Sequence, residues 1–177
     1  MLKIDQTDFD DLLVLTTPSY FDNRGYFHEI YNQSELYRKI KLNFNFCQDN
    51  LSYSKKNVLR GMHYQLKFPQ TKLVYVTFGK IQDVALDLRK NSKTYGKYYS
   101  IILSSKNNKK ILIPKGFAHG FLVLSKFAIV SYKVDEKYYD KMQRTIFYND
   151  SKYKIKWLVD NNKIILSQKD NPLFYKK

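Results

Sequence analysis

A series of short strand-like segments, separated by turn residues, fills the middle of the chain and constrains its fold more than any other feature. Within residues 81–88, Asp83 and Asp87 fall on one face and Val84 and Leu86 on the other, which is the period of a β-strand. Short strands at this regular spacing, with turn signals between them, indicate an all-β sandwich or barrel. The predicted strands of this region are residues 72–78, 81–88, 98–103, 110–114, 120–124 and 128–132.

The best helix of the sequence is predicted at residues 34–40. Ser34 is placed to cap it, Glu35 falls in its first turn, and Arg38 and Lys39 lie near its end, as the helix dipole favours. The remaining predicted strands are residues 12–15, 26–30, 44–48 and 164–166, with a turn at 22–25 and a polar loop from 49 through 57.

The composition is that of a globular chain with one domain. Its 177 residues are enough to bury a sizeable core, and 44% are hydrophobic against 27% charged. No linker or internal repeat divides the sequence, so residues 1–177 are expected to form a single domain. No apolar run approaches the length of a membrane span, and residues 1–11 lack the pattern of a signal peptide. The single cysteine, Cys47, allows no internal disulfide, which fits a cytoplasmic location.

The formal net charge of +15 calls for an explanation. Nucleic acid and an anionic small substrate are two partners that such a charge allows, and a solvated lysine-rich surface is the third interpretation. The lysines are dispersed along the chain, which favours the solvated surface for most of the charge. The aromatic residues alternate with aliphatic ones, as in core strands, whereas a nucleic-acid-binding module gathers them on one exposed face. We therefore expect neither a nucleic-acid partner nor a membrane partner.

The sequence VLRGMHYQ at residues 58–65 is the part of the chain most suggestive of chemistry. In an extended segment His63 and Gln65 share one face, and Arg60 takes the other. A cavity with a titratable base near a guanidinium is one interpretation; a histidine at a strand end, bonded to backbone beside a surface arginine, is the other. His28, within a predicted strand, is expected to be structural.

Pro114, Gly116 and His119 form the pattern P-x-G-x-x-H, in which the turn residues aim the histidine. This pattern is similar to the second motif of cupins, which are small jelly-roll barrels. The first cupin motif supplies metal ligands as H-x-H, whereas the corresponding stretch here ends in Gln65. Because His63 and His119 alone make a poor site for a divalent metal, we expect no metal, and a remaining base points to proton transfer.

A set of motifs runs along nearly the whole chain, at residues 22–27 with Glu29, 48–50, 58–65, 72–74, 83–89, 113–121, 149–150 and 166–170. In this order and at these spacings, they resemble the motifs of the dTDP-4-dehydrorhamnose 3,5-epimerases and related nucleotide-sugar epimerases. The resemblance implies a cupin jelly-roll barrel with short peripheral helices, no cofactor, and a homodimer in which a strand of each chain joins the partner's sheet. The N-terminal third is the expected donor of that strand.

The family's reaction needs a base on one face of a sugar, an acid on the other and a cation near an enolate oxygen, because a C4 ketone makes the hydrogens on C3 and C5 acidic. His63 matches the base and Asp170 the carboxylate that orients it. Tyr132 matches the acid, Lys72 the cation, and His119 a further contact to the sugar.

The resemblance also implies how a nucleotide-diphosphate sugar would be bound. Arg24 and Arg60 match the residues that hold the diphosphate, for which a guanidinium fork is well suited. The other matching positions are Glu29, Gln48, Asn50 and Lys169 for polar contacts, and Tyr138 for stacking on the base.

The sequence departs from the rhamnose enzymes at Thr71, Tyr75, Gln143 and Arg144, all expected at the nucleotide end of the site. These departures leave two substrates open, dTDP-4-dehydro-6-deoxyglucose and a GDP-linked 4-keto-6-deoxy-heptose for capsule synthesis, and leave open whether C3 alone or both centres are inverted. A nucleotide-sugar 3,4-ketoisomerase is a rival that does not need Tyr132. A non-catalytic sugar-binding cupin is another, and the catalytic matches speak against it.

Overall fold

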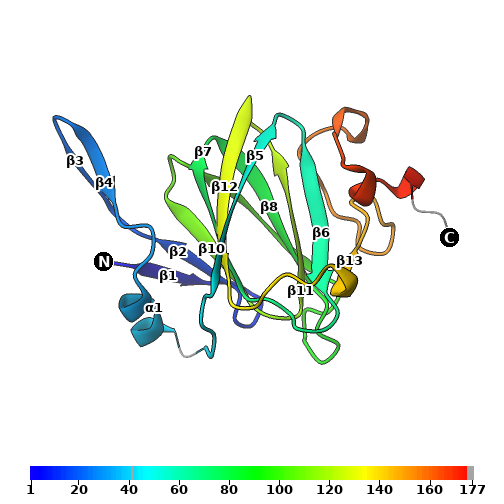
Figure 1. The fold of residues 1–177 in the computed structure, drawn as a ribbon, viewed down its shortest axis with the longest axis horizontal. Helices are drawn as coiled ribbons and strands as arrows, with labels where there is room; N and C mark the ends of the chain where they lie inside the picture. Colours follow the sequence, from blue (N-terminus) through cyan, green and yellow to red (C-terminus); the bar gives the residue numbers. More distant parts are fainter. Residues whose placement is uncertain (41, 175–177) are drawn as a thin grey trace.

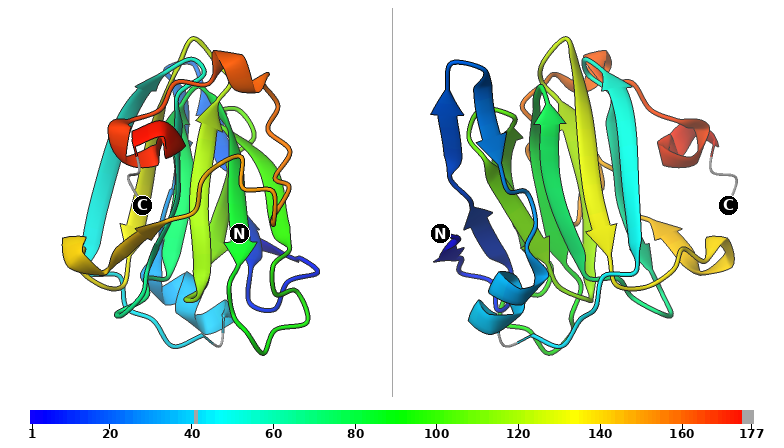
Figure 2. Two further views of the ribbon diagram at one scale, coloured as in Figure 1. Left: turned by 90° about the vertical axis from the view of Figure 1, so that its right-hand side faces the viewer. Right: turned by 60° about the vertical axis from the view of Figure 1, so that its left-hand side comes forward.

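Residues 1–40 and 42–174 are described by a computed structural model, so residue 41 and the last three residues of the expected domain lie outside the described part. Two antiparallel sheets face each other (Figures 1 and 2). The first sheet has the order β1 (Lys3–Gln6), β2 (Leu13–Thr16), β10 (Lys109–Ile113), β7 (Lys72–Phe78), β12 (Phe127–Val134) and β5 (Gln48–Lys55). The second has the order β13 (Gln143–Thr145), β6 (Leu59–Gln65), β11 (Phe117–Val123), β8 (Lys80–Asp87) and β9 (Tyr98–Ser104).

The strands predicted in the middle of the chain are confirmed. β7 has its predicted bounds, and β8 differs from its prediction by one residue at each end. Their alternating side chains meet between the sheets, where Val74, Ile81, Ile111 and Val130 are buried in one cluster. Burying a side chain of this size fully contributes roughly 1.5–3 kcal/mol, so this cluster is a main source of stability.

β5 is where the prediction from sequence is wrong. Residues 44–48 were expected to be a strand and the following residues a polar loop, whereas the strand is Gln48–Lys55. Gln48, Asn50 and Ser52 alternate along it and line a pocket rather than the apolar core, so its inward face is polar. β1, β3 and β13 also carry no strand pattern strong enough to predict, and the strand expected at 164–166 is a single bridge between Ile165 and Val58.

Helical structure is short and peripheral, as expected. α1 (Gln33–Lys39) packs Leu36 against the outer face of the first sheet. Its cap is Asn32 rather than Ser34, because the Asn32 side chain accepts the Glu35 N–H at 3.1 Å. Among residues 1–40 and 42–174, no helix is long and apolar enough to cross a membrane. Four 3₁₀ turns complete the set: η1 (Asp140–Met142), η2 (Asn161–Lys163), η3 (Gln168–Asp170) and η4 (Pro172–Phe174).

A two-stranded hairpin, β3 (Ser19–Asp22) and β4 (Gly25–His28), projects from the body on the side away from the C-terminal turns (Figure 1). Its tip is the predicted turn, where the Asp22 carboxylate accepts the Arg24 N–H at 2.8 Å. The predicted strand 26–30 ends at His28, whose imidazole is bonded to the hydroxyls of Thr17 and Ser19. His28 thus has the structural setting that was expected for it.

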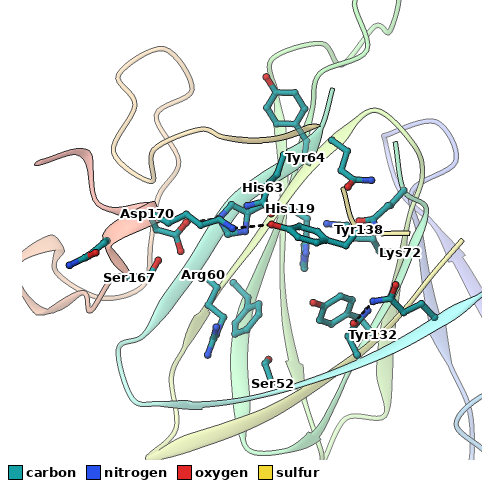
Figure 3. Close-up of a pocket in the computed structure, with 18 residues that line it drawn as sticks. Ser52, Arg60, His63, Tyr64, Lys72, His119, Tyr132, Tyr138, Ser167 and Asp170 are labelled. Carbon is teal, nitrogen blue, oxygen red and sulfur yellow. Dashed lines mark hydrogen bonds and ion pairs between the residues drawn. The ribbon is translucent and has the colours of Figure 1, made fainter. Parts of the chain in front are cut away.

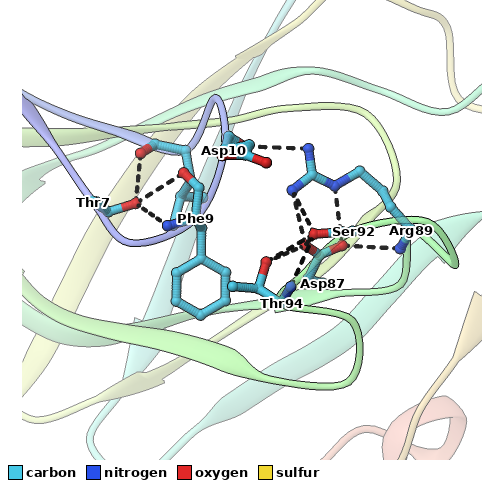
Figure 4. A network of polar contacts seen from close by, with 8 residues as sticks. Thr7, Phe9, Asp10, Asp87, Arg89, Ser92 and Thr94 are labelled. Carbon is cyan, nitrogen blue, oxygen red and sulfur yellow. Dashed lines mark hydrogen bonds and ion pairs between the residues drawn. The ribbon is translucent and has the colours of Figure 1, made fainter.

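A polar network at the end of β8 ties the second sheet to the N-terminal loop (Figure 4). Asp87 accepts hydrogen bonds from Arg89, Ser92 and Thr94, and Arg89 also donates to the Asp10 carbonyl at 3.1 Å. Burial alone would raise the pKa of Asp87, but these hydrogen bonds lower it to about 2. The carboxylate therefore stays charged and holds the loop after β8 in place.

Candidate active site

A pocket of about 740 Å³ lies between the two sheets (Figure 3). Its walls come from β5, β7 and β12 of the first sheet and from β6, β11 and β13 of the second, with η3 at one side. The pocket brings together every predicted catalytic or binding residue except Arg24 and Glu29, namely Gln48, Asn50, Arg60, His63, Lys72, His119, Tyr132, Tyr138, Lys169 and Asp170.

A bulge in β6 sends Arg60 and His63 into the same pocket, although simple alternation placed them on opposite faces. Arg60 pairs with Phe121 and His63 with His119, so Gly61 and its successor together face one residue of β11. Gly61 has φ +115°, and a Cβ there would lie 2.6 Å from the Cα of Gly120. Only glycine fits this close crossing of β6 and β11.

His63, which is partly exposed to the pocket, and the buried Asp170 form an imidazole–carboxylate pair. The Nε2 and Oδ1 atoms are 2.5 Å apart, and Asp170 is 3% exposed. Burial alone would raise the pKa of Asp170, but the hydrogen bond and charge of His63, with further bonds to Ser167 and the Gly61 N–H, lower it overall. An ionised Asp170 can accept the imidazole N–H and so fix the orientation of the ring.

The bridge at Ile165 explains how a residue near the C-terminus reaches β6. The Leu59 N–H donates to the Ile165 carbonyl at 3.0 Å, and the Ile165 N–H donates to Asn57 at 2.9 Å. This pairing lays the tail beside the start of β6, and η3 follows it directly. Asp170 therefore arrives next to His63, although 107 residues separate them in sequence.

Tyr132 and Lys72 lie in the first sheet, across the pocket from His63. Burial raises the pKa of the Tyr132 phenol, and the nearby Arg60 charge offsets part of this effect. The phenol is therefore protonated at neutral pH. Burial lowers the pKa of Lys72 to about 8, with Asp83 acting in the opposite direction. Lys72 thus carries a positive charge at neutral pH and loses it under mildly alkaline conditions.

His119 forms a second imidazole–carboxylate pair at the floor of the site. Its Nε2 is 2.9 Å from Oδ2 of Asp83, which is fully buried. His119 lies inside β11 rather than at the end of a turn, and the turn before it is made by Gly116 at φ +89°. Among the described residues, no group of three or more His, Cys, Asp and Glu side chains is arranged to hold a metal ion.

Polar side chains fill the mouth of the pocket. Gln48 donates to Asn50 at 2.7 Å, and Arg60, which also lines the pocket, donates from Nε to the Ser54 hydroxyl at 2.9 Å. Lys169 donates to the Tyr138 hydroxyl at 3.2 Å, so these two pocket residues are in direct contact. This rim of cations and amides beside an aromatic ring has the chemistry to hold a phosphorylated aromatic ligand.

Arg24 and Glu29 are the two predicted binding residues that the structure keeps out of this pocket. Arg24 is at the tip of the projecting hairpin and pairs with Asp22 at 2.6 Å. Glu29 follows the hairpin and accepts a hydrogen bond from Asn32. Neither side chain lines the pocket of its own chain.

The four departures from the family pattern were expected at the nucleotide end, and of these only Gln143 lines the pocket of its own chain. Thr71 is buried and bonded through its N–H to Asp135, and Arg144 donates to the backbone carbonyls of Lys141 and Gln143. Tyr75 lines a different pocket, on the outer face of the first sheet. Strand alternation in β7 explains this, because Tyr75 and Lys72 point to opposite faces.

Several lining residues were not predicted as site residues. Their only signal in the sequence is that each lies within two residues of a predicted site residue. They are Ser52, Tyr64, Gln65, Gln70, Phe121, Ser167 and Gln168.

Comparison with known proteins agrees with this geometry. Residues 6–175 match the family model described as dTDP-4-dehydrorhamnose 3,5-epimerase. The chain is 42% identical to the enzyme of that name from Escherichia coli, covering 98% of this chain and 94% of the relative, and 44% identical to the one from Methanothermobacter thermautotrophicus, covering 93% and 89%.

Solved structures show the same fold. That of the 3,5-epimerase from Elizabethkingia anophelis superposes with a TM-score of 0.90 at 42% identity, covering 96% of this chain and 93% of that one. The Legionella pneumophila epimerase in complex with dTDP-4-keto-L-rhamnose gives 0.92 at 39% identity, covering 96% and 90%. The predicted cupin jelly-roll fold is confirmed. By sequence and by structure, this chain belongs to the dTDP-4-dehydrorhamnose 3,5-epimerase family.

Proposed function

We propose that this protein inverts C3 and C5 of dTDP-4-dehydro-6-deoxyglucose, giving dTDP-4-dehydrorhamnose. The observation that carries the proposal is the placement of His63, paired with Asp170 of η3, on one sheet and of Tyr132 on the other, with the pocket between them. The relatives' names and the Legionella complex with dTDP-4-keto-L-rhamnose support the choice of nucleotide sugar.

The chemistry follows from the charge states of the pocket. His63, oriented by Asp170, removes the proton from the carbon next to the C4 ketone, and the electron pair moves onto the keto oxygen. The Lys72 ammonium stabilises that enolate oxygen. Tyr132 then gives its phenolic proton to the opposite face of the same carbon. Tyr132 recovers a proton from solvent, and His63 releases to solvent the proton that it took. His119 contacts the sugar from the floor of the pocket.

The nucleotide occupies the mouth. Arg60 holds the diphosphate, Tyr138 stacks on the base, and Lys169 with the amides of Gln48 and Asn50 makes the remaining polar contacts. No metal or cofactor takes part. The unpaired Cys47 suits a cytoplasmic enzyme, where thiols stay reduced.

The active species is a homodimer in which the β3–β4 hairpin of each chain reaches its partner. The hairpin carries Phe21 and Phe27, which are 77% and 68% exposed, and exposed aromatic residues of this size mark an interaction surface. In this arrangement Arg24 and Glu29 complete the partner's nucleotide site instead of their own.

Proton NMR in deuterated water tests the reaction. Purified protein with dTDP-4-keto-6-deoxyglucose should place deuterium at both C3 and C5, whereas a GDP-4-keto-6-deoxy-heptose should exchange slowly or not at all. Deuterium at C3 alone would show a single-centre epimerase. Exchange only with the GDP sugar would show that the substrate carries GDP instead of dTDP. Tyr132→Phe separates epimerase from 3,4-ketoisomerase, since only the epimerase loses most of its turnover.

A further inference from the structure

Gln65 ends β6, two residues after His63, and is only 8% exposed. All the hydrogen-bonding groups of its side-chain amide are engaged by backbone. Nε2 donates to the carbonyls of Phe68 at 2.7 Å and Lys137 at 3.1 Å, and Oε1 accepts the Tyr139 N–H at 2.6 Å. Such an amide is a fixed structural link and is not free to bind a ligand.

Two of these bonds flank Tyr138. The amide binds the residue before it and the residue after it, so Gln65 clamps the backbone on both sides of the pocket aromatic. Gln70 adds a further hydrogen bond to this segment by donating to the Glu136 carbonyl at 2.9 Å. The segment has no regular structure between β12 and η1, so these side chains supply the hydrogen bonds that a helix or sheet would otherwise provide.

We propose that Gln65 is a positioning residue that holds Tyr138 at a fixed place relative to His63, and so sets how tightly the pocket holds the base of the nucleotide. The inference rests on the proposed function. β6 carries His63 and Gln65 together, so one strand fixes both the reacting end and the nucleotide end of the site. A ring that is already in place spares the ligand the cost of ordering the loop on binding.

The chemistry of the clamp requires an amide. A carboxylate of the same size would bring an oxygen against the carbonyls of Phe68 and Lys137 and could donate to neither. A neutral imidazole has a single N–H and could satisfy only one of them. Glutamine supplies two donors and one acceptor, which is what this position uses.

The chain contains a matched control. Gln82 is 2% exposed, and its Nε2 donates to the Lys156 carbonyl at 2.8 Å and the Ser100 hydroxyl at 3.0 Å, while its Oε1 accepts the Leu158 N–H at 2.8 Å. It clamps a loop in the same way, but neither Gln82 nor that loop lines the active-site pocket. A substitution at Gln82 should therefore lower the stability of the protein without changing nucleotide binding.

The test compares Gln65→Glu with Gln82→Glu. Both variants should lose thermal stability, because each buries a carboxylate against carbonyl or hydroxyl oxygens. Gln65→Glu alone should weaken the binding of dTDP, measured by calorimetry, by roughly tenfold or more, and raise KM by a similar factor with kcat at saturation within a few fold. If Gln65→Glu does not fold, Gln65→Met removes the same bonds without adding a charge.

A double-mutant cycle with Tyr138→Ala shows whether the effect runs through the ring. Once the ring is absent, Gln65→Glu should change dTDP affinity by less than about twofold. Fully additive losses, or equal losses of affinity from Gln65→Glu and Gln82→Glu, would overturn the positioning role. If the wild-type protein neither binds dTDP nor exchanges deuterium, the proposed function itself fails. If it does both and Gln65→Glu keeps full affinity, the positioning inference alone is wrong.

Discussion

His63 and Asp170 are joined by one short hydrogen bond, and the two residues should differ in what their loss does. His63→Ala removes the proposed base, so deuterium exchange at C3 and C5 should fall by roughly 10²- to 10⁴-fold, with dTDP affinity within a few fold of wild type. Asp170→Asn keeps the base but loses its orienting charge, so exchange should fall strongly but less than in His63→Ala. Normal deuterium exchange by His63→Ala would show that His63 is not the base. Unimpaired exchange by Asp170→Asn would show that Asp170 does not orient His63.

The pKa of Lys72 predicts how the activity depends on pH. Burial lowers its pKa to about 8, so the ammonium is present below that pH and is lost above it. The value of kcat/KM should therefore fall as the pH rises through about 8. Tyr132 is not the cause, because burial raises its pKa from an ordinary value that is already higher.

Substitutions by arginine test the assignment of this pH dependence. Lys72→Arg keeps its charge at alkaline pH, so any activity that remains should lose the decline near pH 8. Lys115→Arg, which changes a lysine outside the pocket that pairs with Asp135, should keep it. If the decline in kcat/KM near pH 8 persists in Lys72→Arg, a group other than Lys72 causes it.

The sequence by itself predicts few of these residues. Histidine is rare in the chain and titrates near neutral pH, so His63 and His119 stand out without any other information. Tyr132 and Lys72 resemble ordinary strand residues, and Asp170 lies in a tail without periodicity. Their interpretation as site residues came from the resemblance to a family. The local sequence pattern does not predict which distant segments pair with each other.

At the scale of single elements, the bulge in β6 makes a sharp prediction about Gly61. In Gly61→Ala the new Cβ would lie 2.6 Å from backbone of β11, so either strand must move, and the aim of Arg60 and His63 moves with it. We expect a loss of roughly 2–4 kcal/mol in the free energy of unfolding, from overpacking and backbone strain together, and a large loss of turnover.

Gly96→Ala is the control for this prediction. Gly96 also has a positive φ, of +76°, but a Cβ there meets nothing within 4 Å. It should cost only the backbone strain, about 1–2 kcal/mol, and leave turnover unchanged. Urea unfolding of both variants gives the comparison, and equal losses of stability and activity would show that the close crossing at Gly61 is unimportant.

The elements divide into those that local pattern predicts and those that it does not. β7 and β8 pack against an apolar core, so their alternation is visible in the sequence. β5 packs against a polar pocket, so its pattern resembles that of a loop. The bulge in β6 is invisible in the sequence for a related reason, since it depends on how closely β11 crosses at Gly120.

At the scale of the whole molecule, the hairpin is the part of the structure that a single chain does not explain. Among the described residues, β3 and β4 pair as strands only with each other, and their aromatic side chains, Tyr20, Phe21, Tyr26 and Phe27, are exposed. Arg24 is 86% exposed at the tip, bonded only to Asp22 among the hydrogen bonds of the described residues. In a dimer with two-fold symmetry, the exposed aromatic side chains would form the contact with the second copy of the chain, and Arg24 would reach that copy's pocket.

Subunit mixing tests whether Arg24 serves the partner's site. Arg24→Ala and His63→Ala should each be weakly active alone, the first through poor nucleotide binding and the second through loss of the base. In a mixed dimer, one site combines the intact His63 of one chain with the intact Arg24 of the other, while the second site lacks both. Random exchange of subunits should therefore restore about a quarter of the sites to full function. If Arg24 acted within its own chain, no site of the mixed dimer would be intact, and activity after mixing would stay at the average of the two variants.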